Sequence, residues 1–370
     1  MDKLLQARET IDKIDKEMAR LFCERMNAVT EVAAYKKERG LAIFDATRED
    51  AVIAKNTARI EDDALRSYYT LFLKNTMALS RQYQYHLMKG ARIAYSGVEG
   101  AFAHIAASRI FTNGITVSHS DFESAYNSVV AGECDYAVLP IENSYAGEVG
   151  QVMDLMYTGS LYINGIYDLR ITQNLVGLAG TKAEDIKTVI SHPQAINQCQ
   201  GYVQKHGYKI EQAANTARAA QEIVKRGDRS VAAIASAESA SLYGLSLIDH
   251  DINESAVNTT RFAVFSRVEN NTSLDKQNTF LLLFTVNNVA GALAKAISVI
   301  GKHGFNMKVL RSRPAKEKAW QYYFYVEAEG DEHSTEGKEM LAELKMHCDK
   351  LKVVGRYAIE INLEESETLV

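Results

Sequence analysis

The sequence is poor in proline and cysteine, and it lacks both a long apolar run and a basic surplus. No apolar window approaches the roughly 18 residues of a membrane helix. The charged N-terminal segment lacks the apolar core of a signal peptide. A net charge of −5 argues against a nucleic-acid binder, which needs a basic face. The four cysteines have no CxxC spacing, so we expect free thiols and a cytoplasmic location.

Metal-binding motifs are also missing. The nine histidines include no HExxH pair or other ligand spacing, so we predict no metal and no cofactor. The composition, 46% hydrophobic and 24% charged, is that of a globular protein, and 370 residues suggest two or three domains. The three prolines, Pro140, Pro193 and Pro314, lie in short segments that are singled out below.

Residues 1–89 have the pattern of a helical domain. Residues 1–88 contain no proline and a single glycine, Gly40, which suits a helix end. Apolar residues recur at helical spacing before it. We expect a second helix to begin after Asp45 or Thr47, with Thr47 as N-cap, and a third to cover about Leu65–Leu87.

Residues 91–268 alternate between strand-like and helix-like stretches. This alternation predicts an α/β domain with a largely parallel sheet. Ligands of such sheets bind beyond the carboxyl ends of the strands, where Pro140–Ser144 and Ser191–Gln194 fall. A polar stretch, 269–277, reads as a linker. Residues 278–361 then follow the order βαββαβ, with strands expected over 305–314 and 320–329, which predicts a small ferredoxin-like domain.

Two cations share a helix face with apolar residues in the first region, Arg25 and Lys36. They either reach water, pair with acidic side chains, or bind an anionic ligand. The pattern LLQARETIDKID…ERMNAV…YKKERG…DATRED…ALSRQYQ resembles the AroQ-type chorismate mutases. The resemblance implies a site that holds chorismate in a compact conformer and stabilises the ether oxygen. The implied residues are Arg8, Arg25, Lys36, Asp45, Arg48, Glu49, Ser80 and Gln84, with Lys36 and Gln84 on the ether oxygen.

The spacing of two of these residues has a geometric consequence. Arg8 and Arg25 are 17 positions apart, or roughly 25 Å along a continuous helix. They cannot hold one small molecule from one chain, so Arg8 would come from a second copy. This agrees with the interlocked helical dimer of the family, and we expect a homodimer or a dimer of dimers.

Three motifs of the second region resemble prephenate dehydratases and occur in the family's order. They are Pro140-Ile141-Glu142-Asn143-Ser144, Ser191-His192-Pro193-Gln194 and Asn258-Thr259-Thr260-Arg261-Phe262. The resemblance implies a two-lobed, periplasmic-binding-like fold, with Thr260 as proton donor to the leaving hydroxyl of prephenate. The other implied substrate contacts are Glu142, Asn143, Ser144, Ser191, Gln194, Thr216 and Arg261.

Each of these motifs also has a purely structural interpretation. Thr260 could open a strand, Asn143 and Ser144 could cap a helix beginning near Glu148, and His192 could be a packing residue. One departure is Val98, where the family often has proline.

The third region resembles the ACT domains that are attached to prephenate dehydratases. The matching stretches are Val289–Leu293 and Ser312–Pro314 with Trp320. The resemblance implies a phenylalanine site, and hence feedback inhibition, formed by Gly291, Ala292, Leu293, Arg311, Ser312, Arg313 and Pro314. Arg311 stands where the family pattern has glutamate, which reverses a charge beside this site. Without ligand binding, the domain would be a dimerisation module.

We therefore expect a bifunctional enzyme that makes prephenate from chorismate and phenylpyruvate from prephenate, with phenylalanine as effector. Arogenate dehydratase with a mutase domain is the enzymatic alternative. A non-catalytic amino-acid-sensing binder is the alternative from another class, and it would predict loss of the Thr260-Arg261-Phe262 triplet, which is present. Degeneration of one catalytic domain is a further possibility, against which the complete polar set of residues 1–88 argues.

Overall fold

The computed structural model describes residues 3–39, 46–255, 257–269, 279–315, 320–357 and 361–363. It divides into two compact units. One contains mainly residues 1–92, and the other mainly residues 136–370 with most of 93–130. No helix within these described ranges is long and apolar enough to span a membrane.

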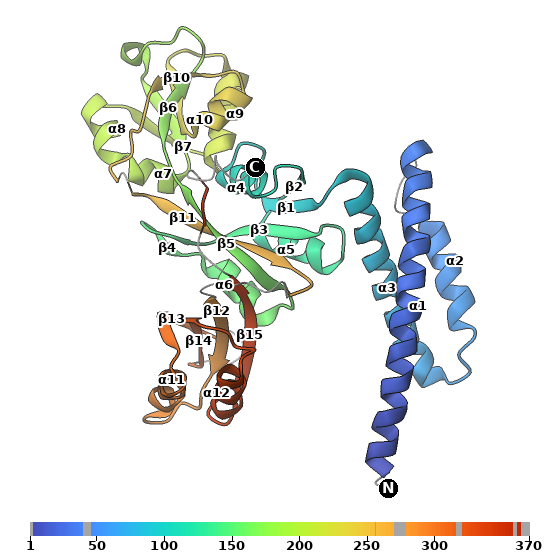
Figure 1. The fold of residues 1–370 in the computed structure, drawn as a ribbon. Helices are drawn as coiled ribbons and strands as arrows, with labels where there is room; N and C mark the ends of the chain where they lie inside the picture. Colours follow the sequence, from blue (N-terminus) through green and yellow to red (C-terminus); the bar gives the residue numbers. More distant parts are fainter. Residues whose placement is uncertain are drawn as a thin grey trace. The chain divides into compact units, whose positions relative to one another are not determined.

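The N-terminal unit consists of three helices, α1 (Lys3–Arg39), α2 (Ala46–Thr57) and α3 (Asp63–Lys89) (Figure 1). Since α2 begins at Ala46, Thr47 lies inside it, and the predicted Thr47 cap is wrong. Asp45 lies outside the described residues. The helix α3 begins two residues before the predicted Leu65, because the carboxylate of Asp62 accepts hydrogen bonds from the amides of Ala64 and Leu65.

The second unit begins with a lobe built on one half of a large sheet, in the order β5-β11-β3-β1-β2. Strand β11 is antiparallel to both β3 and β5, so the predicted, largely parallel sheet is wrong here. The chain leaves this lobe after β5 and returns through β11, which reverses its direction. The bounds are β1 (Arg92–Ser96), α4 (Phe102–Ile110), β2 (Ile115–His119), α5 (Phe122–Val130), β3 (Tyr136–Asn143), β4 (Gly147–Glu148), α6 (Gly150–Thr158), β5 (Tyr162–Arg170) and β11 (Thr259–Ser266).

A second lobe lies between β5 and β11 in the sequence. Its five-stranded sheet has the order β10-β6-β9-β7-β8, in which β7 runs parallel to β8 and β9 and the β6 pairs are antiparallel. The elements are β6 (Asn174–Gly177), β7 (Thr188–Ser191), α7 (Pro193–Gln198), α8 (Gln200–His206), β8 (Lys209–Gln212), α9 (Thr216–Arg226), β9 (Val231–Ala235), α10 (Ala237–Leu242) and β10 (Ser246–Asp249). The α/β region is therefore two-lobed, as expected.

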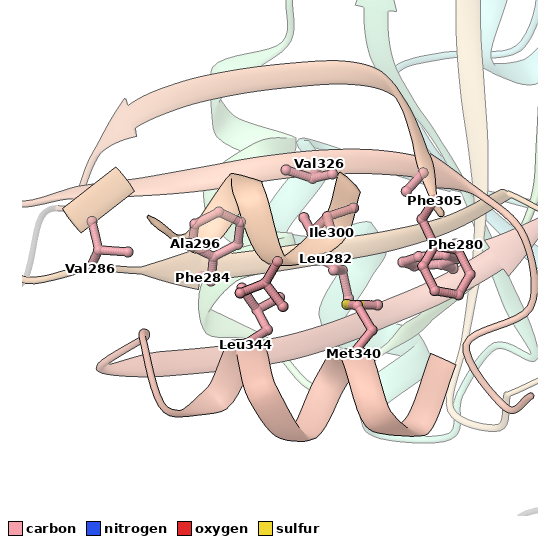
Figure 2. Packing of buried hydrophobic residues seen from close by; sticks show 12 residues of the cluster. Phe280, Leu282, Phe284, Val286, Ala296, Ile300, Phe305, Val326, Met340 and Leu344 are labelled. Atoms are coloured by element: carbon pink, nitrogen blue, oxygen red, sulfur yellow. The ribbon is translucent and has the colours of Figure 1, made fainter. Parts of the chain in front are cut away.

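The C-terminal segment has the expected element order βαββαβ. It comprises β12 (Thr279–Thr285), α11 (Ala292–Lys302), β13 (Asn306–Pro314), β14 (Tyr322–Glu329), α12 (Thr335–Lys345) and β15 (Lys350–Tyr357). Alternate residues of β12, namely Phe280, Leu282 and Phe284, pack with Ile300 of α11 and Leu344 of α12 (Figure 2). The strand predicted over 320–329 begins later, at Tyr322, because Trp320 has a positive φ of 61°.

The C-terminal sheet, in the order β13-β14-β12-β15, continues into the sheet of the first lobe through β15 and β5. The contact is a single register pair, Gly355 with Ile163. A Cβ at Gly355 would lie 2.1 Å from the carbonyl oxygen of Ile163, and φ there is +148°. Only glycine permits so close an approach of the two backbones. A short strand, β16 (Ile361–Asn362), also pairs with β5.

Candidate active sites

Thr260 and Asn143 form the centre of the first lobe's polar site. They are register partners on β11 and β3, and the Asn143 amide Nδ2 donates to Thr260 Oγ1 over 2.9 Å. The same nitrogen donates to Asn258 Oδ1 over 2.9 Å. Because Thr260 Oγ1 accepts from Asn143, its own hydrogen remains available to a ligand, and the accepted bond polarises that hydroxyl. Only 8% of the surface of Thr260 is exposed to solvent, so little water competes for this donor.

The segment after β3 is a turn clipped to β11, and the helix-cap interpretation of Asn143 and Ser144 is wrong. Asn143 Oδ1 accepts from the amides of Tyr145 and Ala146, which closes an Asx-type turn. Ser144 Oγ accepts from the Thr259 amide and donates to the Val257 carbonyl. The next helix, α6, begins only at Gly150 and has no side-chain cap. These bonds fix the backbone on both sides of Thr260.

A β-bulge precedes this polar pair. Arg261 pairs with Glu142, whereas Phe262 pairs with Pro140, so β3 carries one extra residue, Ile141. Arg261 forms a bidentate pair with the buried Glu327 of β14, at 3.1 Å to each oxygen, and lies 3.5 Å from Glu142. The residue next to Thr260 is thus bound to the C-terminal segment.

Glu327 keeps its charge despite complete burial. Burial alone would raise the pKa of this carboxyl, but the charge and hydrogen bonds of Arg261 hold it below its usual value. The hydroxyls of Tyr325 and Tyr357 each donate to it over 2.7 Å. A buried, fully hydrogen-bonded carboxylate makes a rigid anchor for Arg261.

A cleft of about 240 Å³ lies between the two lobes, and five of its lining residues are titratable side chains that were not predicted from the sequence: Arg109, Arg170, Glu238, His250 and Asp251. Its lining includes Leu169, the register partner of Thr260 on β5, so the cleft reaches the strand that neighbours Thr260. Arg170 ends β5 at its rim, is exposed, and has no partner within the described ranges. The sequence feature that could have identified Arg170 is its place as a cation at the end of a largely apolar strand. Other lining residues are Phe102, Ile105, Arg109, Thr172, Asn174, Ala237, Glu238, His250 and Asp251.

Several direct contacts join the two lobes near this cleft, among them a hydrogen bond from the Tyr243 hydroxyl to the Glu99 carbonyl. Arg109 of α4 pairs with Glu238 of α10 at 2.6 Å, and Ser239 Oγ donates to the Gly100 carbonyl over 2.8 Å. Gly100 has a φ of +86°, and a Cβ at this position would lie 3.0 Å from Ser239 Oγ. The last position of the turn 97–100 therefore favours glycine. The turn where Val98 replaces proline is therefore part of the contact between lobes.

The predicted residues of the second lobe fall into two groups. Ser191 is fully buried, and its hydroxyl donates to the Ile234 carbonyl over 2.6 Å, so it holds the sheet together and presents no surface to a substrate. His192 caps α7, and burial lowers its pKa, which favours the neutral ring that accepts from the Gln194 amide. Gln194 and Thr216 lie in the first turns of α7 and α9.

The helical unit brings part of its predicted set together. Arg25 donates to Ser80 Oγ between α1 and α3, and burial lowers the Arg25 pKa. Gln84 lies one turn after Ser80; it is 7% exposed, and its Oε1 has no partner among the described residues. Glu49 pairs with Arg81, which the sequence analysis did not select. Arg8 is exposed on α1, far along the helix from Arg25. Lys36 is half-buried, Arg48 is exposed, and Asp45 is outside the described residues.

The predicted effector residues do not share one cavity. Gly291 has φ +80° and directly precedes α11, with open space where a Cβ would lie. A cavity of about 310 Å³ is lined by Val289, Ala290 and Ala292, but by none of 311–314. Arg311 and Arg313 face the first lobe instead, where Arg311 pairs with Glu142 at 2.5 Å and Arg313 pairs with Glu148.

The described residues contain one group with metal-ligating side chains, Glu269, Glu332 and His333, which the sequence analysis did not anticipate. Arg356 lies 4.0 Å from Glu332 and 3.6 Å from Asp331. This adjacent cation supplies the positive charge that the cluster needs, so we interpret it as a set of ion pairs.

Comparison with known proteins agrees with this geometry. Residues 93–270 match the family model described as prephenate dehydratase, and residues 7–85 match chorismate mutase type II. Curated bifunctional chorismate mutase/prephenate dehydratases from Buchnera aphidicola and Escherichia coli are each 30% identical, covering 97% and 96% of both chains. An Arabidopsis thaliana arogenate dehydratase/prephenate dehydratase is 32% identical, covering 73% of this chain and 72% of its own.

Two solved structures resemble the second unit. The prephenate dehydratase of Arthrobacter aurescens in complex with L-Phe has a TM-score of 0.67 and 25% identity, covering 75% of this chain and 92% of its own. A protein described as GqqA, a novel type of quorum quenching acylase, has a TM-score of 0.67 and 28% identity, covering 73% of this chain and 98% of its own. Since the curated relatives match both the helical and the two-lobed regions along almost the whole sequence, this chain belongs to the family of bifunctional chorismate mutase/prephenate dehydratases.

Proposed function

We propose that Thr260 delivers the proton, or the hydrogen bond, by which prephenate loses its hydroxyl in the second reaction of this bifunctional enzyme. The ring carboxylate leaves as carbon dioxide and its electrons expel the hydroxyl, which departs as water once it is protonated. Aromatisation drives the step, so a weak acid in the right position suffices. The observation that carries the proposal is the bond from Asn143 Nδ2 to Thr260 Oγ1, which leaves the threonine hydrogen as the free donor.

The roles of the neighbouring residues follow from their contacts. Asn143 and Ser144 position Thr260, because their own polar atoms are engaged with β11 and the turn. Prephenate carries two carboxylates, and we assign their binding to Arg170 and Arg109 at the cleft, together with Gln194 and Thr216 of the second lobe. Glu142 and Arg261 act as a support behind Thr260.

For the first reaction we propose a site shared between two copies of the helical region. Arg25 and Ser80 bind a carboxylate of chorismate, Lys36 and Gln84 contact the ether oxygen, and Glu49 binds the ring hydroxyl. The unpartnered Gln84 Oε1 supports a ligand at this place. Arg8 comes from a second copy, and Arg48 and Asp45 complete the set. The exposed apolar residues of α1, among them Ile11, Ile14 and Leu21, support a homodimer or a dimer of dimers.

For the C-terminal segment, residues 278–361, we propose an ACT domain that binds phenylalanine and inhibits the dehydratase domain, residues 91–268. The sheet order β13-β14-β12-β15 with both helices on one face supports a ferredoxin-like fold. The L-Phe complex of the Arthrobacter aurescens relative supports the ligand. Gly291 at the start of α11 offers backbone amides for the phenylalanine carboxylate, with residues 292–293 beside it. Residues 311–314 do not line the cavity beside Ala292, and in the proposed site they reach the ligand from the paired domain of a second copy.

A coupled assay tests the whole proposal. Purified protein is given chorismate, and prephenate and phenylpyruvate are measured over time, with and without phenylalanine. We expect prephenate first, phenylpyruvate second, and less phenylpyruvate when phenylalanine is present. A parallel reaction with arogenate tests the alternative that the Arabidopsis relative favours. Faster turnover of arogenate than of prephenate would replace the proposed substrate.

A further inference from the structure

We propose that Arg311 is a positioning residue for the dehydratase reaction, acting through Glu142 and Arg261 on Thr260. The inference rests on the proposed function of Thr260 and goes beyond it, because it assigns a role in catalysis to a side chain of the C-terminal segment. This is the position where the family pattern has glutamate, so the role belongs to this chain's own sequence.

The C-terminal sheet presents a charged face to the first lobe. Residues of β14 with odd numbers, such as Tyr325 and Glu327, point away from the helices, since Val326 packs into the helix-covered core. Arg311 is the register partner of Tyr325 and therefore lies on the same face as Glu327. Two neighbouring strands, β13 and β14, thus supply one cation and one anion to the same side.

Arg311 and Glu327 each form an ion pair with one member of the cross-strand pair Glu142–Arg261 in the first lobe. Arg311 pairs with Glu142 at 2.5 Å, and Glu327 pairs with Arg261 at 3.1 Å. Between Glu142 and Arg261 themselves the distance is 3.5 Å, a loose contact. Positive and negative charges alternate along the row Arg311, Glu142, Arg261 and Glu327, so each charged group is attracted to its neighbours in the row.

The held pair is next to the catalytic pair. Glu142 and Arg261 directly adjoin Asn143 and Thr260 in the register, and the bulge at Ile141 lies on their other side. A bulge interrupts the ladder and leaves the register after it less firmly fixed. The ion pairs from the C-terminal segment therefore add to the Ser144–Thr259 bond in fixing the register in which Asn143 Nδ2 meets Thr260 Oγ1.

The charge of the side chain at position 311 should therefore affect kcat of the dehydratase reaction. Arg311→Lys keeps the attraction to Glu142, Arg311→Gln removes it, and Arg311→Glu places two carboxylates together. We expect kcat for prephenate to fall in that order, by about twofold, tenfold and a hundredfold, since small misplacements of reacting groups have effects of this size. KM should change by less than about twofold, because no substrate contact is lost. Mutase activity in the same samples should stay constant.

A double substitution tests whether Glu142 transmits the effect. If Arg311 acts through Glu142, Arg311→Gln should lower kcat no further in a Glu142→Gln background. Lys302→Gln is the matched control. Lys302 of α11 also pairs with a glutamate, but its partner, Glu343 of α12, belongs to the C-terminal segment itself, so the substitution should leave kcat unchanged.

Three outcomes would overturn the inference: unchanged kcat in Arg311→Gln, multiplication of the two single effects in the double variant, or parallel loss of both activities in Arg311→Gln and Arg311→Lys. If wild-type protein has no dehydratase activity, the proposed function fails first. If wild type is active and Arg311→Gln equals it, the inference about Arg311 fails alone.

Discussion

The first lobe and the helical unit place their polar groups in different ways. In the first lobe, Thr260 is 8% exposed, and the side chains that orient it come from the same chain. In the helical unit, α1 leaves Ile11 and Ile14 each 54% exposed, and Arg8 lies on the same long helix as Arg25 without reaching it. On the proposed assignments, the dehydratase site is built within one chain, whereas the mutase site takes Arg8 from a second copy.

The largest effect should come from removing the hydroxyl of Thr260. Thr260→Ala should lower dehydratase kcat by a factor of roughly 10² or more, the usual contribution of a positioned proton donor. Mutase activity should stay within about twofold of wild type, because the helical region forms a compact unit separate from the one that contains Thr260. Both rates are measured on one sample, with chorismate and with prephenate as substrates.

Thr260→Ser is the matched control, since it keeps the hydroxyl and removes only a methyl group. It should retain most of the dehydratase activity. If Thr260→Ala were as active as Thr260→Ser, the proton would have another source, and the cleft residues Arg109 and Arg170 would be the next candidates for charge stabilisation.

The sequence predicted this lobe's motifs but not their contacts. The segments Glu142–Ser144 and Asn258–Arg261 were recognisable as sequence motifs. Because more than a hundred residues separate them, the sequence did not indicate that β3 and β11 are antiparallel neighbours. That pairing depends on the return of the chain from the second lobe. Asn143 was therefore expected to bind substrate, although the fold commits its amide to Thr260 and Asn258.

Sequence patterns predicted those features whose physical cause lies in neighbouring residues. The continuous helix α1, the end of that helix before Gly40 and the βαββαβ order all follow from periodicity and turn residues nearby. Cleft residues such as Arg170 could not be identified in this way, because the cleft exists only where two lobes meet. Arg311 shows the same limit: its departure from the family pattern was visible, but its partner Glu142 was not.

The shared mutase site can be tested by mixing inactive variants. Arg8→Ala and Lys36→Ala proteins should each lack mutase activity. After mixing and refolding together, half of the dimers are mixed, and each mixed dimer has one intact site, so about a quarter of wild-type activity should return. Chorismate consumption is measured before and after mixing.

Dehydratase activity of the same mixtures is the internal control, and it should stay constant, since Thr260 and its supports come from one chain. If mutase activity did not recover although the refolded protein retained its dehydratase activity, both groups would have to serve a site within one chain. Residual activity of the Arg8→Ala protein alone would instead show that Arg8 is dispensable.

The smallest effect concerns the C-terminal segment, whose predicted effector residues lie in two places. A cavity of about 310 Å³ adjoins Ala292, while Arg311 and Arg313 are engaged with Glu142 and Glu148 of the first lobe. Phenylalanine that bound near Ser312 would compete with or strengthen these ion pairs, and so change the support behind Thr260. At a hundredfold excess over Kd, a ligand stabilises its protein by about 2.7 kcal/mol, or roughly 10–20 °C for a domain of this size.

Thermal unfolding with phenylalanine, and with alanine as control, measures this stabilisation. The shift should appear with phenylalanine alone and should be accompanied by a lower dehydratase rate. In Arg311→Gln protein the shift should persist if the ligand binds beside Gly291, because that residue has no contact with the ion pairs. The inhibition should weaken at the same time, because the connection from the C-terminal segment to Thr260 runs through Glu142 and Arg261. No shift with either amino acid would reduce the C-terminal segment to a dimerisation module that also holds Glu142 and Arg261 in register.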